Sequence, residues 1–128
     1  MNRKEIEKIL IVDDDKDWRE TIGDILKKQG YKILFAKNGR TSLKILKKEN
    51  IDLIILDLRL PDISGMEVLE KAKNMLNPVK VIMISAYGNK TIKKRAKGAG
   101  VLEFMDKPFS EKRLSAIVMK AFKNGEKR

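Results

Sequence analysis

The sequence predicts an α/β domain in which helices cover both faces of a parallel β-sheet. Short runs rich in Ile and Val, typical of buried strands, alternate with longer segments whose apolar residues recur every three or four positions, as on one face of a helix. The resulting order, βαβαβαβαβα, favours parallel pairing because a helical crossover separates each strand from the next. The chain has 128 residues, the size of one ordinary domain, and 42% of them are hydrophobic, which suffices for a core.

Five apolar runs are interpreted as the strands, and a segment with helical spacing follows each of them. The runs are KILIV (8–12), KILFA (32–36), DLIIL (52–56), KVIMI (80–84) and VLEFM (101–105). The helical stripes are Trp18, Ile22, Ile25 and Leu26; Leu43 and Leu46; Met66, Leu69 and Ala72; Ile92, Ala96 and Ala99; and Leu114, Ile117, Val118, Ala121 and Phe122. Gly30 is expected to end the first helix and Ser110 to cap the last, with Glu111 in its first turn.

No linker or low-complexity segment interrupts this pattern, so we expect a single domain over residues 1–128, with its core between about residues 7 and 124. The initial Met and the missing linker favour a complete chain, and the final KNGEKR is expected to fray. No run approaches the roughly 20 apolar residues of a membrane span, and no export signal follows the charged MNRKEIEK. We therefore expect a cytoplasmic protein.

The composition excludes several kinds of chemistry. The chain contains neither Cys nor His, which rules out disulfides, thiolates, the commonest transition-metal ligand and any histidine base. The net charge is +11, and most of it lies in residues 89–128, which carry 12 basic and 4 acidic side chains. Nucleic acid, an anionic membrane or an acidic protein are the partners that suit such a surface. A solvated lysine-rich surface is the simplest interpretation, because few aromatic residues accompany the lysines.

Polar residues follow four of the five predicted strands. They are Asp13, Asp14 and Asp15 after the first strand, Asp57 after the third, Ser85 after the fourth, and Asp106, Lys107 and Pro108 after the fifth. Each alone has an ordinary explanation as a helix cap, a turn residue or a surface lysine. In an open parallel sheet, ligands bind beyond the carboxyl ends of the strands. The shared position of these residues therefore predicts one functional site.

The residue types at this edge suit phosphoryl chemistry. Clustered carboxylates raise one another's pKa unless a cation offsets them, and oxygen ligands without His or Cys indicate Mg²⁺, Ca²⁺ or Mn²⁺. A cation held in this way commonly serves a phosphoryl group, whose oxygens lysine and serine can bind. An aspartate can itself be the nucleophile and form an aspartyl-phosphate. We therefore hypothesise that Asp57 is a nucleophile that a rigid sheet holds in place.

Four motifs carry a resemblance to a known family. In this order and spacing, ILIVDDD, IILDLRLPDISG, VIMISAYG and FMDKPF resemble the receiver domain of bacterial two-component response regulators, and most closely its stand-alone chemotaxis and sporulation phosphorelay members. The resemblance covers about residues 7–124. It implies a flavodoxin-like (βα)5 three-layer sandwich with a parallel five-stranded sheet of order 2-1-3-4-5.

The resemblance also implies roles for the acidic residues. Asp57 matches the phosphoacceptor. Asp13 and Asp14 match the acidic pair that holds Mg²⁺ together with Asp57 and the backbone carbonyl of Arg59, and Mn²⁺ or Ca²⁺ would replace Mg²⁺ in vitro. Asp15 is an additional acid, which either strengthens the attraction for the cation or caps the following helix.

Other positions match the residues that surround the phosphoryl group in the family. Ser85 matches the hydroxyl residue that bonds it, and Lys107 matches its positive partner, with a cis Lys107–Pro108 bond expected. Phe104 matches an aromatic switch position that responds together with Ser85. Arg59 and Tyr87 are bulky, and we hypothesise that they shield the acyl phosphate from water and so lengthen its lifetime.

The absence of histidine also constrains the partners. The chain must receive its phosphoryl group from a phosphohistidine on a sensor histidine kinase or a histidine phosphotransfer protein. By the resemblance, phosphorylation switches the face formed by the fourth helix, fifth strand and fifth helix, which lies in the basic third of the sequence. We expect a downstream protein effector with an acidic surface, no direct DNA binding, no membrane, and a monomer or a phosphorylation-dependent dimer. Such a domain signals and is not an enzyme, although it catalyses its own phosphorylation and slow dephosphorylation.

Other functions remain as alternatives. A phosphatase or phosphotransferase of the haloacid-dehalogenase type also uses an aspartyl nucleophile, but it places a second acid two residues later, where this chain has Arg59. A basic nucleic-acid-binding module would suit the charge, yet the sequence has neither a helix-turn-helix pattern nor stacking aromatics. The intact set of site residues argues against a degenerate receiver that binds without phosphorylation.

Overall fold

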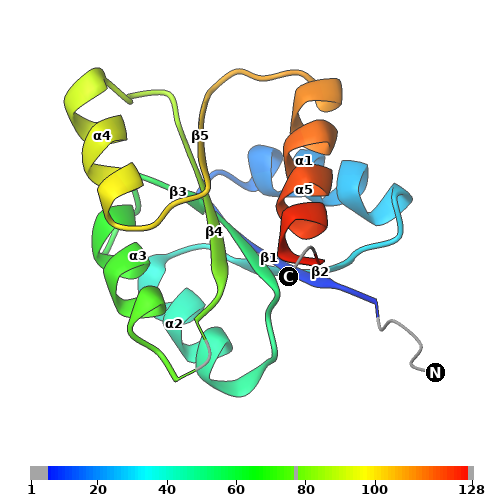
Figure 1. The fold of residues 1–128 in the computed structure, drawn as a ribbon, viewed down its shortest axis with the longest axis horizontal. Coiled ribbons are helices and arrows are strands. Elements are labelled where there is room, and N and C mark those ends of the chain that lie inside the picture. Colours follow the sequence, from blue (N-terminus) through cyan, green and yellow to red (C-terminus); the bar gives the residue numbers. More distant parts are fainter. Residues whose placement is uncertain (1–5, 77, 127–128) are drawn as a thin grey trace.

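A computed structural model describes residues 6–76 and 78–126 of the chain (Figure 1). Strands and helices alternate in it: β1 (Lys8–Val12), α1 (Lys16–Lys28), β2 (Lys32–Ala36), α2 (Gly39–Lys48), β3 (Leu53–Asp57), α3 (Gly65–Lys73), β4 (Lys80–Ser85), α4 (Lys90–Gly98), β5 (Glu103–Asp106) and α5 (Glu111–Glu126). The five strands are parallel and lie in the order β2-β1-β3-β4-β5. The predicted fold class and strand order are therefore confirmed. Within the described residues, no helix combines the length and apolar character that crossing a membrane requires.

The helices form two layers, one on each face of the sheet. Helices α1 and α5 pack on the face that contains Ile9 and Ile11 of β1, while α2, α3 and α4 pack on the face that contains Leu10 and Val12 (Figure 1). This division follows from the strand geometry, because successive side chains of a strand point to opposite faces. The central strands β1 and β3 are buried along almost their whole length, as their unbroken apolar runs indicated.

Side-chain caps determine where the helices begin, close to the ends of the preceding strands. Asp15, Asn38, Ser64 and Asn89 are the N-caps of α1 to α4, and each accepts a hydrogen bond from a backbone N–H of the first turn. Ser110 accepts one from Arg113 in α5, as predicted (3.0 Å). The loops at the carboxyl edge of the sheet are consequently short and fixed at both ends.

The register places the carboxyl ends of four strands beside one another. Val12 pairs with Leu56, and Asp57 pairs with Ile84. The predicted third strand, 52–56, is corrected to Leu53–Asp57, because pairing with β4 continues through Asp57 and the N–H of Leu58 still donates to the carbonyl of Ile84 (2.9 Å). Asp57 is thus part of a buried, hydrogen-bonded strand.

The segment after α4 differs from the prediction, and the end of α5 tests it only in part. Strand β5 begins at Glu103, not at 101, because the N–H of Val101 donates to the carbonyl of Ala96 and closes α4 (3.1 Å). Helix α5 is assigned as far as Glu126, so the helix includes Lys123, where the expected frayed end begins, while residues 127–128 lie outside the described part and the fraying stays a prediction. The burial of Phe122 in the core anchors this last part of α5 to the sheet.

Candidate functional site

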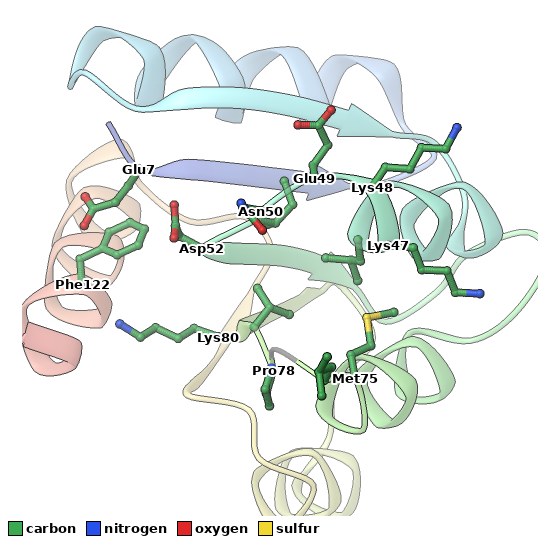
Figure 2. Close-up of a pocket in the computed structure, with 14 residues that line it drawn as sticks. Glu7, Lys47, Lys48, Glu49, Asn50, Asp52, Met75, Pro78, Lys80 and Phe122 are labelled. Carbon is green, nitrogen blue, oxygen red and sulfur yellow. The ribbon is translucent and has the colours of Figure 1, made fainter. Parts of the chain in front are cut away.

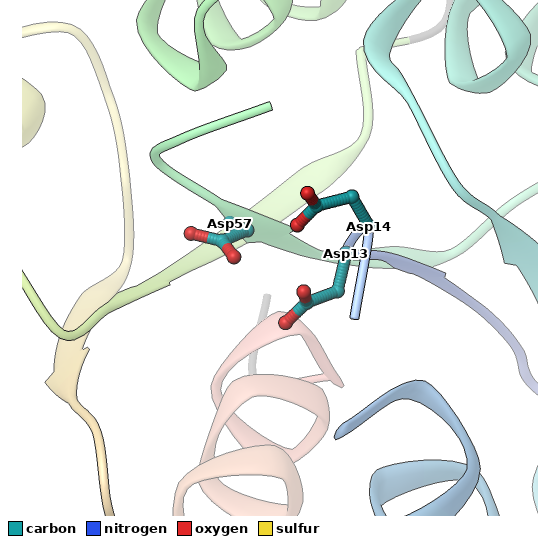
Figure 3. A group of neighbouring side chains, drawn as sticks. All are labelled: Asp13, Asp14 and Asp57. Atoms are coloured by element: carbon teal, nitrogen blue, oxygen red, sulfur yellow. The ribbon is translucent and has the colours of Figure 1, made fainter. Parts of the chain in front are cut away.

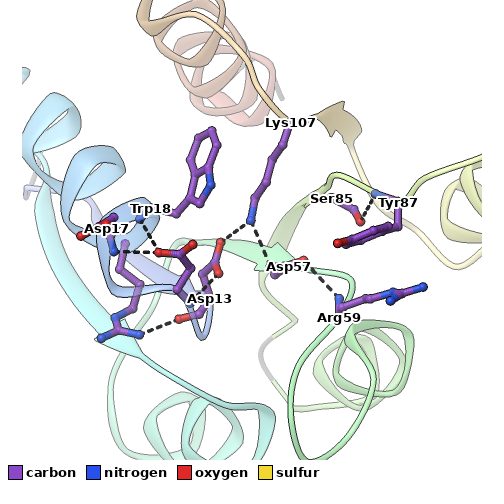
Figure 4. Close-up of polar contacts among 10 residues, drawn as sticks. Asp13, Asp17, Trp18, Asp57, Arg59, Ser85, Tyr87 and Lys107 are labelled. Carbon is purple, nitrogen blue, oxygen red and sulfur yellow. Dashed lines mark hydrogen bonds and ion pairs between the residues drawn. The ribbon is translucent and has the colours of Figure 1, made fainter.

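The carboxyl edge of the sheet brings together residues that are far apart in the sequence. Asp13 follows β1, Asp57 ends β3, Ser85 ends β4 and Lys107 follows β5. Figure 4 shows Asp13, Asp57 and Lys107 pointing toward one another, with Ser85 beside them. Asp13, Asp57 and Ser85 are buried. Buried polar side chains normally have hydrogen-bond or ionic partners, so the contacts of these three residues define the site.

Three carboxylates form an acidic cluster at the centre of this edge (Figure 3). One oxygen from each of Asp13, Asp14 and Asp57 lies within 4.8 Å of the other two. Asp13 is fully buried and Asp14 is exposed, so the cluster connects the protein interior with solvent. Oxygen ligands without nitrogen or sulfur suit hard cations such as Mg²⁺, Mn²⁺ and Ca²⁺, and the cluster therefore fits the divalent cation that the sequence predicted.

Asp15 has a different role from its two neighbours. Its carboxylate accepts hydrogen bonds from the N–H groups of Asp17 (2.9 Å) and Trp18 (3.4 Å), and it is thereby the N-cap of α1. Its own N–H donates to the carboxylate of Asp13 (2.9 Å). Of the two roles that the sequence left open for Asp15, the structure supports the helix cap.

Lys107 connects two of the carboxylates. Its ammonium donates to Oδ2 of Asp13 at 2.8 Å and to Oδ2 of Asp57 at 3.1 Å, and its side chain is only 10% exposed. Burial disfavours the charged ammonium, but the hydrogen bonds and charges of Asp13 and Asp57 outweigh burial and raise the pKa of Lys107. Lys107 therefore remains a cation beside the acidic cluster. The Lys107–Pro108 bond is cis, as expected.

The surroundings of Asp57 disfavour the ionised form of its carboxyl group. Burial, followed by the charge of Asp13, raises the pKa of Asp57 from 3.8 to about 6, although the N–H of Arg59 and the ammonium of Lys107 oppose this rise. The Arg59 N–H donates to Oδ1 of Asp57 at 3.1 Å. One ammonium is thus too little to offset two buried carboxylates, and an additional positive charge would be bound favourably.

Ser85 and the loop that follows it form the opposite wall of the site. The buried Ser85 hydroxyl accepts a hydrogen bond from the N–H of Tyr87 (2.8 Å). The Tyr87 ring, 60% exposed, lies under the guanidinium of Arg59, whose central carbon is 4.1 Å from the ring centroid. Arg59 and Tyr87 therefore form a stacked pair beside Asp57 and Ser85 (Figure 4).

Phe104 lies under the same loop and is partly buried. It packs against the core cluster on the α2, α3 and α4 side of the sheet. A Cβ on Gly88 would come within 2.6 Å of its ring, so the loop rests directly on Phe104. Lys93 of α4 lies 5.7 Å from the ring centroid and forms a 2.7 Å ion pair with Asp106. The aromatic side chain is therefore enclosed by the loop before α4 and by α4 itself.

Sequence reasoning did not identify several contacts of the site. Trp18 was assigned only to the apolar stripe of α1, yet its ring lies 4.9 Å from the ammonium of Lys107. Arg19 donates to the carbonyl of Asp13 (2.8 Å), and Gly65 packs so closely on the carbonyl of Asp57 that any side chain would overlap it. The position of Trp18 and Arg19 in the first turn of a helix that begins at the acidic loop was the signal that could have indicated these contacts.

A cavity of about 780 Å³ lies at the opposite edge of the sheet (Figure 2). It is lined by residues at the amino ends of the strands, such as Glu7, Asp52 and Lys80, together with apolar residues such as Met75 and Phe122. It shares no residue with the acidic cluster. This cavity and the candidate site are therefore separate features.

Comparisons with known proteins agree with this geometry. A family model described as the response regulator receiver domain matches residues 9–119. The chain is 38% identical over 103 residues to the sporulation initiation phosphotransferase F of Bacillus subtilis (strain 168), covering 80% of this chain and 83% of that protein. It is also 35% identical over 112 residues to the transcriptional regulatory protein YrkP of the same organism, covering 88% of this chain but only 48% of YrkP.

Solved structures show the same similarity. A response regulator receiver domain protein (CheY-like) from Methanospirillum hungatei JF-1 matches with a TM-score of 0.89 and 29% identity, covering 97% of this chain and 100% of that one. The strand order, the residues at the carboxyl edge and the match to the family model over most of the sequence agree. This chain belongs to the response regulator receiver domain family.

Proposed function

We propose that residues 1–128 act as a single phosphoacceptor receiver domain, in which Asp57 takes a phosphoryl group from a phosphohistidine of another protein. The observation that carries this proposal is the placement of Asp57. It ends a fully buried strand, lies beside Asp13 and Asp14, accepts a hydrogen bond from Lys107, and has a raised pKa. A carboxylate that is poorly neutralised in this way remains a reactive nucleophile when an additional cation lowers the local repulsion.

Asp13, Asp14 and Asp57 are the residues that would hold a divalent cation, for which we propose Mg²⁺, with the carbonyl of Arg59 as a further ligand. The cluster of three carboxylates within 4.8 Å supports this assignment. When bound, the cation would supply positive charge that offsets the charge of the transferred phosphoryl group.

The protein groups then have separate tasks in the transfer. A carboxylate oxygen of Asp57 forms a bond to phosphorus while the bond between phosphorus and the imidazole nitrogen of the donor breaks, and the electron pair of that bond stays on the imidazole. The ammonium of Lys107, already 3.1 Å from Asp57, pairs with the incoming phosphoryl oxygens. The Ser85 hydroxyl, which now accepts from Tyr87, would donate its own hydrogen to those oxygens.

The donor must lie on another protein, because this chain contains no histidine. A sensor histidine kinase or a histidine phosphotransfer protein fits this requirement. The name of the Bacillus subtilis relative, a sporulation initiation phosphotransferase, supports a place in a phosphorelay. We therefore propose a signalling domain that catalyses its own phosphorylation and slow dephosphorylation.

We propose that the conformational change caused by phosphorylation is transmitted from the site through Ser85 and Phe104 to helix α4. A phosphoryl group adds roughly −1.5 to −2 charge near neutral pH, which would draw Ser85 toward it and shift the loop that rests on Phe104. Helix α4 contains five basic residues and no acid, namely Lys90, Lys93, Lys94, Arg95 and Lys97. This composition supports a downstream protein with an acidic surface that binds the face formed by α4, β5 and α5.

Incubation with Mg²⁺ and acetyl phosphate tests the central proposal. We expect the mass of the intact chain to increase by one phosphoryl group, and the product to be reduced by borohydride, as an acyl phosphate is. The Asp57→Asn variant should take up none, while the Asp24→Asn variant, which changes an exposed aspartate of α1, should behave like the unaltered chain. Uptake that persists in Asp57→Asn, or no uptake from either acetyl phosphate or a phosphorylated histidine kinase, would contradict the proposal.

A further inference from the structure

Lys107 has an aromatic neighbour in addition to its two carboxylate partners. Its ammonium lies 4.9 Å from the centroid of the Trp18 ring, and it donates to Asp13 and Asp57 at 2.8 and 3.1 Å. Figure 4 shows the indole alongside the lysine chain, whose end points toward the acids. The lysine side chain is 10% exposed, so the carboxylates and the indole contact a lysine that is largely shielded from solvent.

Trp18 is itself fixed by two contacts. Its backbone N–H donates to the Asp15 cap in the first turn of α1 (3.4 Å). Its ring packs against Phe109, with ring centroids 5.2 Å apart and planes inclined by 45°. Phe109 comes two residues after Lys107, so the pair of rings joins α1 to the loop that carries the lysine. Both rings also pack against the core cluster on the α1 and α5 side.

We infer that Trp18 is a positioning residue for Lys107, because its ring face restricts the ammonium to the side of the site where Asp13 and Asp57 lie. A lysine has a flexible four-carbon chain and loses much rotamer freedom when its end is fixed. An aromatic face attracts a cation and provides a wall that water does not occupy. The ring therefore favours the orientation that the lysine needs, without contacting the reacting atoms.

The consequence for catalysis rests on the proposed function. When Asp57 receives a phosphoryl group, the ammonium must already lie where negative charge develops, since positioning and neutralisation supply most of the catalysis in phosphoryl transfer. Without the indole, the Lys107 side chain would sample other orientations, and its ammonium would less often lie beside the negative charge that develops during transfer. The maximal rate of phosphoryl uptake should fall, whereas the affinity for the donor should change little.

Three variants test this inference. Trp18→Leu removes the ring and keeps apolar bulk, and Trp18→Phe keeps an aromatic face. The control is Phe35→Leu, which removes the ring beneath Lys27 on the β2 edge, where the ammonium is 5.5 Å from the centroid. Thermal unfolding of each variant verifies that it is folded before any rate is compared.

The first measurement does not involve phosphorylation. In a ¹H–¹³C spectrum, the ring current of Trp18 should shift the ε-methylene protons of Lys107 upfield of those of exposed lysines. This shift should disappear in Trp18→Leu, persist in part in Trp18→Phe and remain in Phe35→Leu. An unshifted Lys107 resonance in the unaltered chain would show that the contact is absent in solution and would overturn the inference.

The second measurement is the rate of phosphoryl uptake from acetyl phosphate with Mg²⁺ over a range of donor concentrations. Trp18→Leu should lower the maximal rate roughly three- to tenfold with little change in KM, and Trp18→Phe should recover most of the loss. Equal maximal rates in the unaltered chain and Trp18→Leu, with the ring-current shift present, would overturn the positioning role and leave the proposed function intact. No uptake by the unaltered chain would overturn both.

Discussion

Lys107 and Asp57 lie 50 positions apart in the sequence, yet the ammonium of one is 3.1 Å from a carboxylate oxygen of the other. This ion pair does not return Asp57 to the behaviour of an ordinary aspartate. Asp13 shares the same ammonium at 2.8 Å, so one positive charge faces two buried negative charges. The site therefore carries an excess of negative charge that a further cation would neutralise. We expect the stability of the fold to depend on pH and on bound metal for this reason.

In the absence of divalent cations, Asp57 is expected to destabilise the fold as the pH rises. Burial and the charge of Asp13 raise its pKa from 3.8 in an ordinary aspartate to about 6 in the folded chain. The folded chain therefore holds this proton more tightly than the unfolded chain. The resulting stabilisation is complete below the unfolded value of 3.8 and is lost as the pH rises through about 6.

Asp57→Asn should remove this dependence, because an amide has the same shape without the charge. In EDTA at about pH 7.5 we expect its free energy of unfolding to exceed that of the unaltered chain by on the order of 2 kcal/mol. The difference should shrink as the pH falls through about 6 and vanish below the unfolded value of 3.8, where the aspartate is protonated in both states. Urea unfolding across this pH range measures it, and a difference that is constant with pH would show that Asp57 titrates normally.

Mg²⁺ should stabilise the folded chain through the acidic cluster. Binding to the folded state alone adds about 2.7 kcal/mol at a concentration one hundred times the dissociation constant. Asp14→Asn is the sharpest test, because Asp14 is exposed and its replacement leaves the buried packing intact. The increase in Tm with Mg²⁺ should be much smaller in Asp14→Asn and unchanged in Asp24→Asn. A full Mg²⁺ response in Asp14→Asn would remove Asp14 from the proposed site.

The fold was predictable from the sequence because its signals are local and repeated. The alternating apolar runs identified all five strands, and Gly30, with φ of +98°, occurs just after α1 as its position predicted. The predicted boundaries of the strands were wrong where backbone hydrogen bonds, and not side chains, determine where a strand begins or ends. Val101 is apolar like a strand residue, but its N–H closes α4, and no property of its side chain indicates this.

The candidate site was predictable in its residues but not in its charge balance. Asp57 and Lys107 could be placed at one edge because parallel strands end on the same side of a sheet. Their distance, and the sharing of the ammonium with Asp13, depend on rotamers and register that a sequence does not specify. The contact between Trp18 and Lys107 was missed for the same reason, since an apolar residue at a helical position equally predicts a place in the core.

The stacked pair of Arg59 and Tyr87 should determine how long the phosphoryl group persists. We propose that the pair shields the acyl phosphate from water, so either Arg59→Ala or Tyr87→Ala should accelerate its hydrolysis about two- to fivefold. Because each side chain positions the other at 4.1 Å, the double variant should lose little more than either single one. Decay of the phosphorylated chain after removal of the donor measures this, with Tyr87→Phe as the control that keeps the ring. Unchanged decay in both alanine variants would contradict the shielding role.

Gly88 should be required for the position of Phe104, and Gly98, the last residue of α4, allows a matched test. A Cβ on Gly88 would come within 2.6 Å of the Phe104 ring, whereas a Cβ on Gly98 has no atom within 4 Å among its described surroundings. Gly88→Ala should therefore lower the free energy of unfolding by about 1–3 kcal/mol and displace the Phe104 ring. Gly98→Ala lies within α4 and should instead raise it, by up to about 1 kcal/mol. Urea unfolding measures both energies, and the NMR resonances of Phe104 report the ring. If Gly88→Ala is as stable as Gly98→Ala and leaves those resonances unshifted, the loop does not hold Phe104 in place. A signal from Ser85 would then need another route to α4.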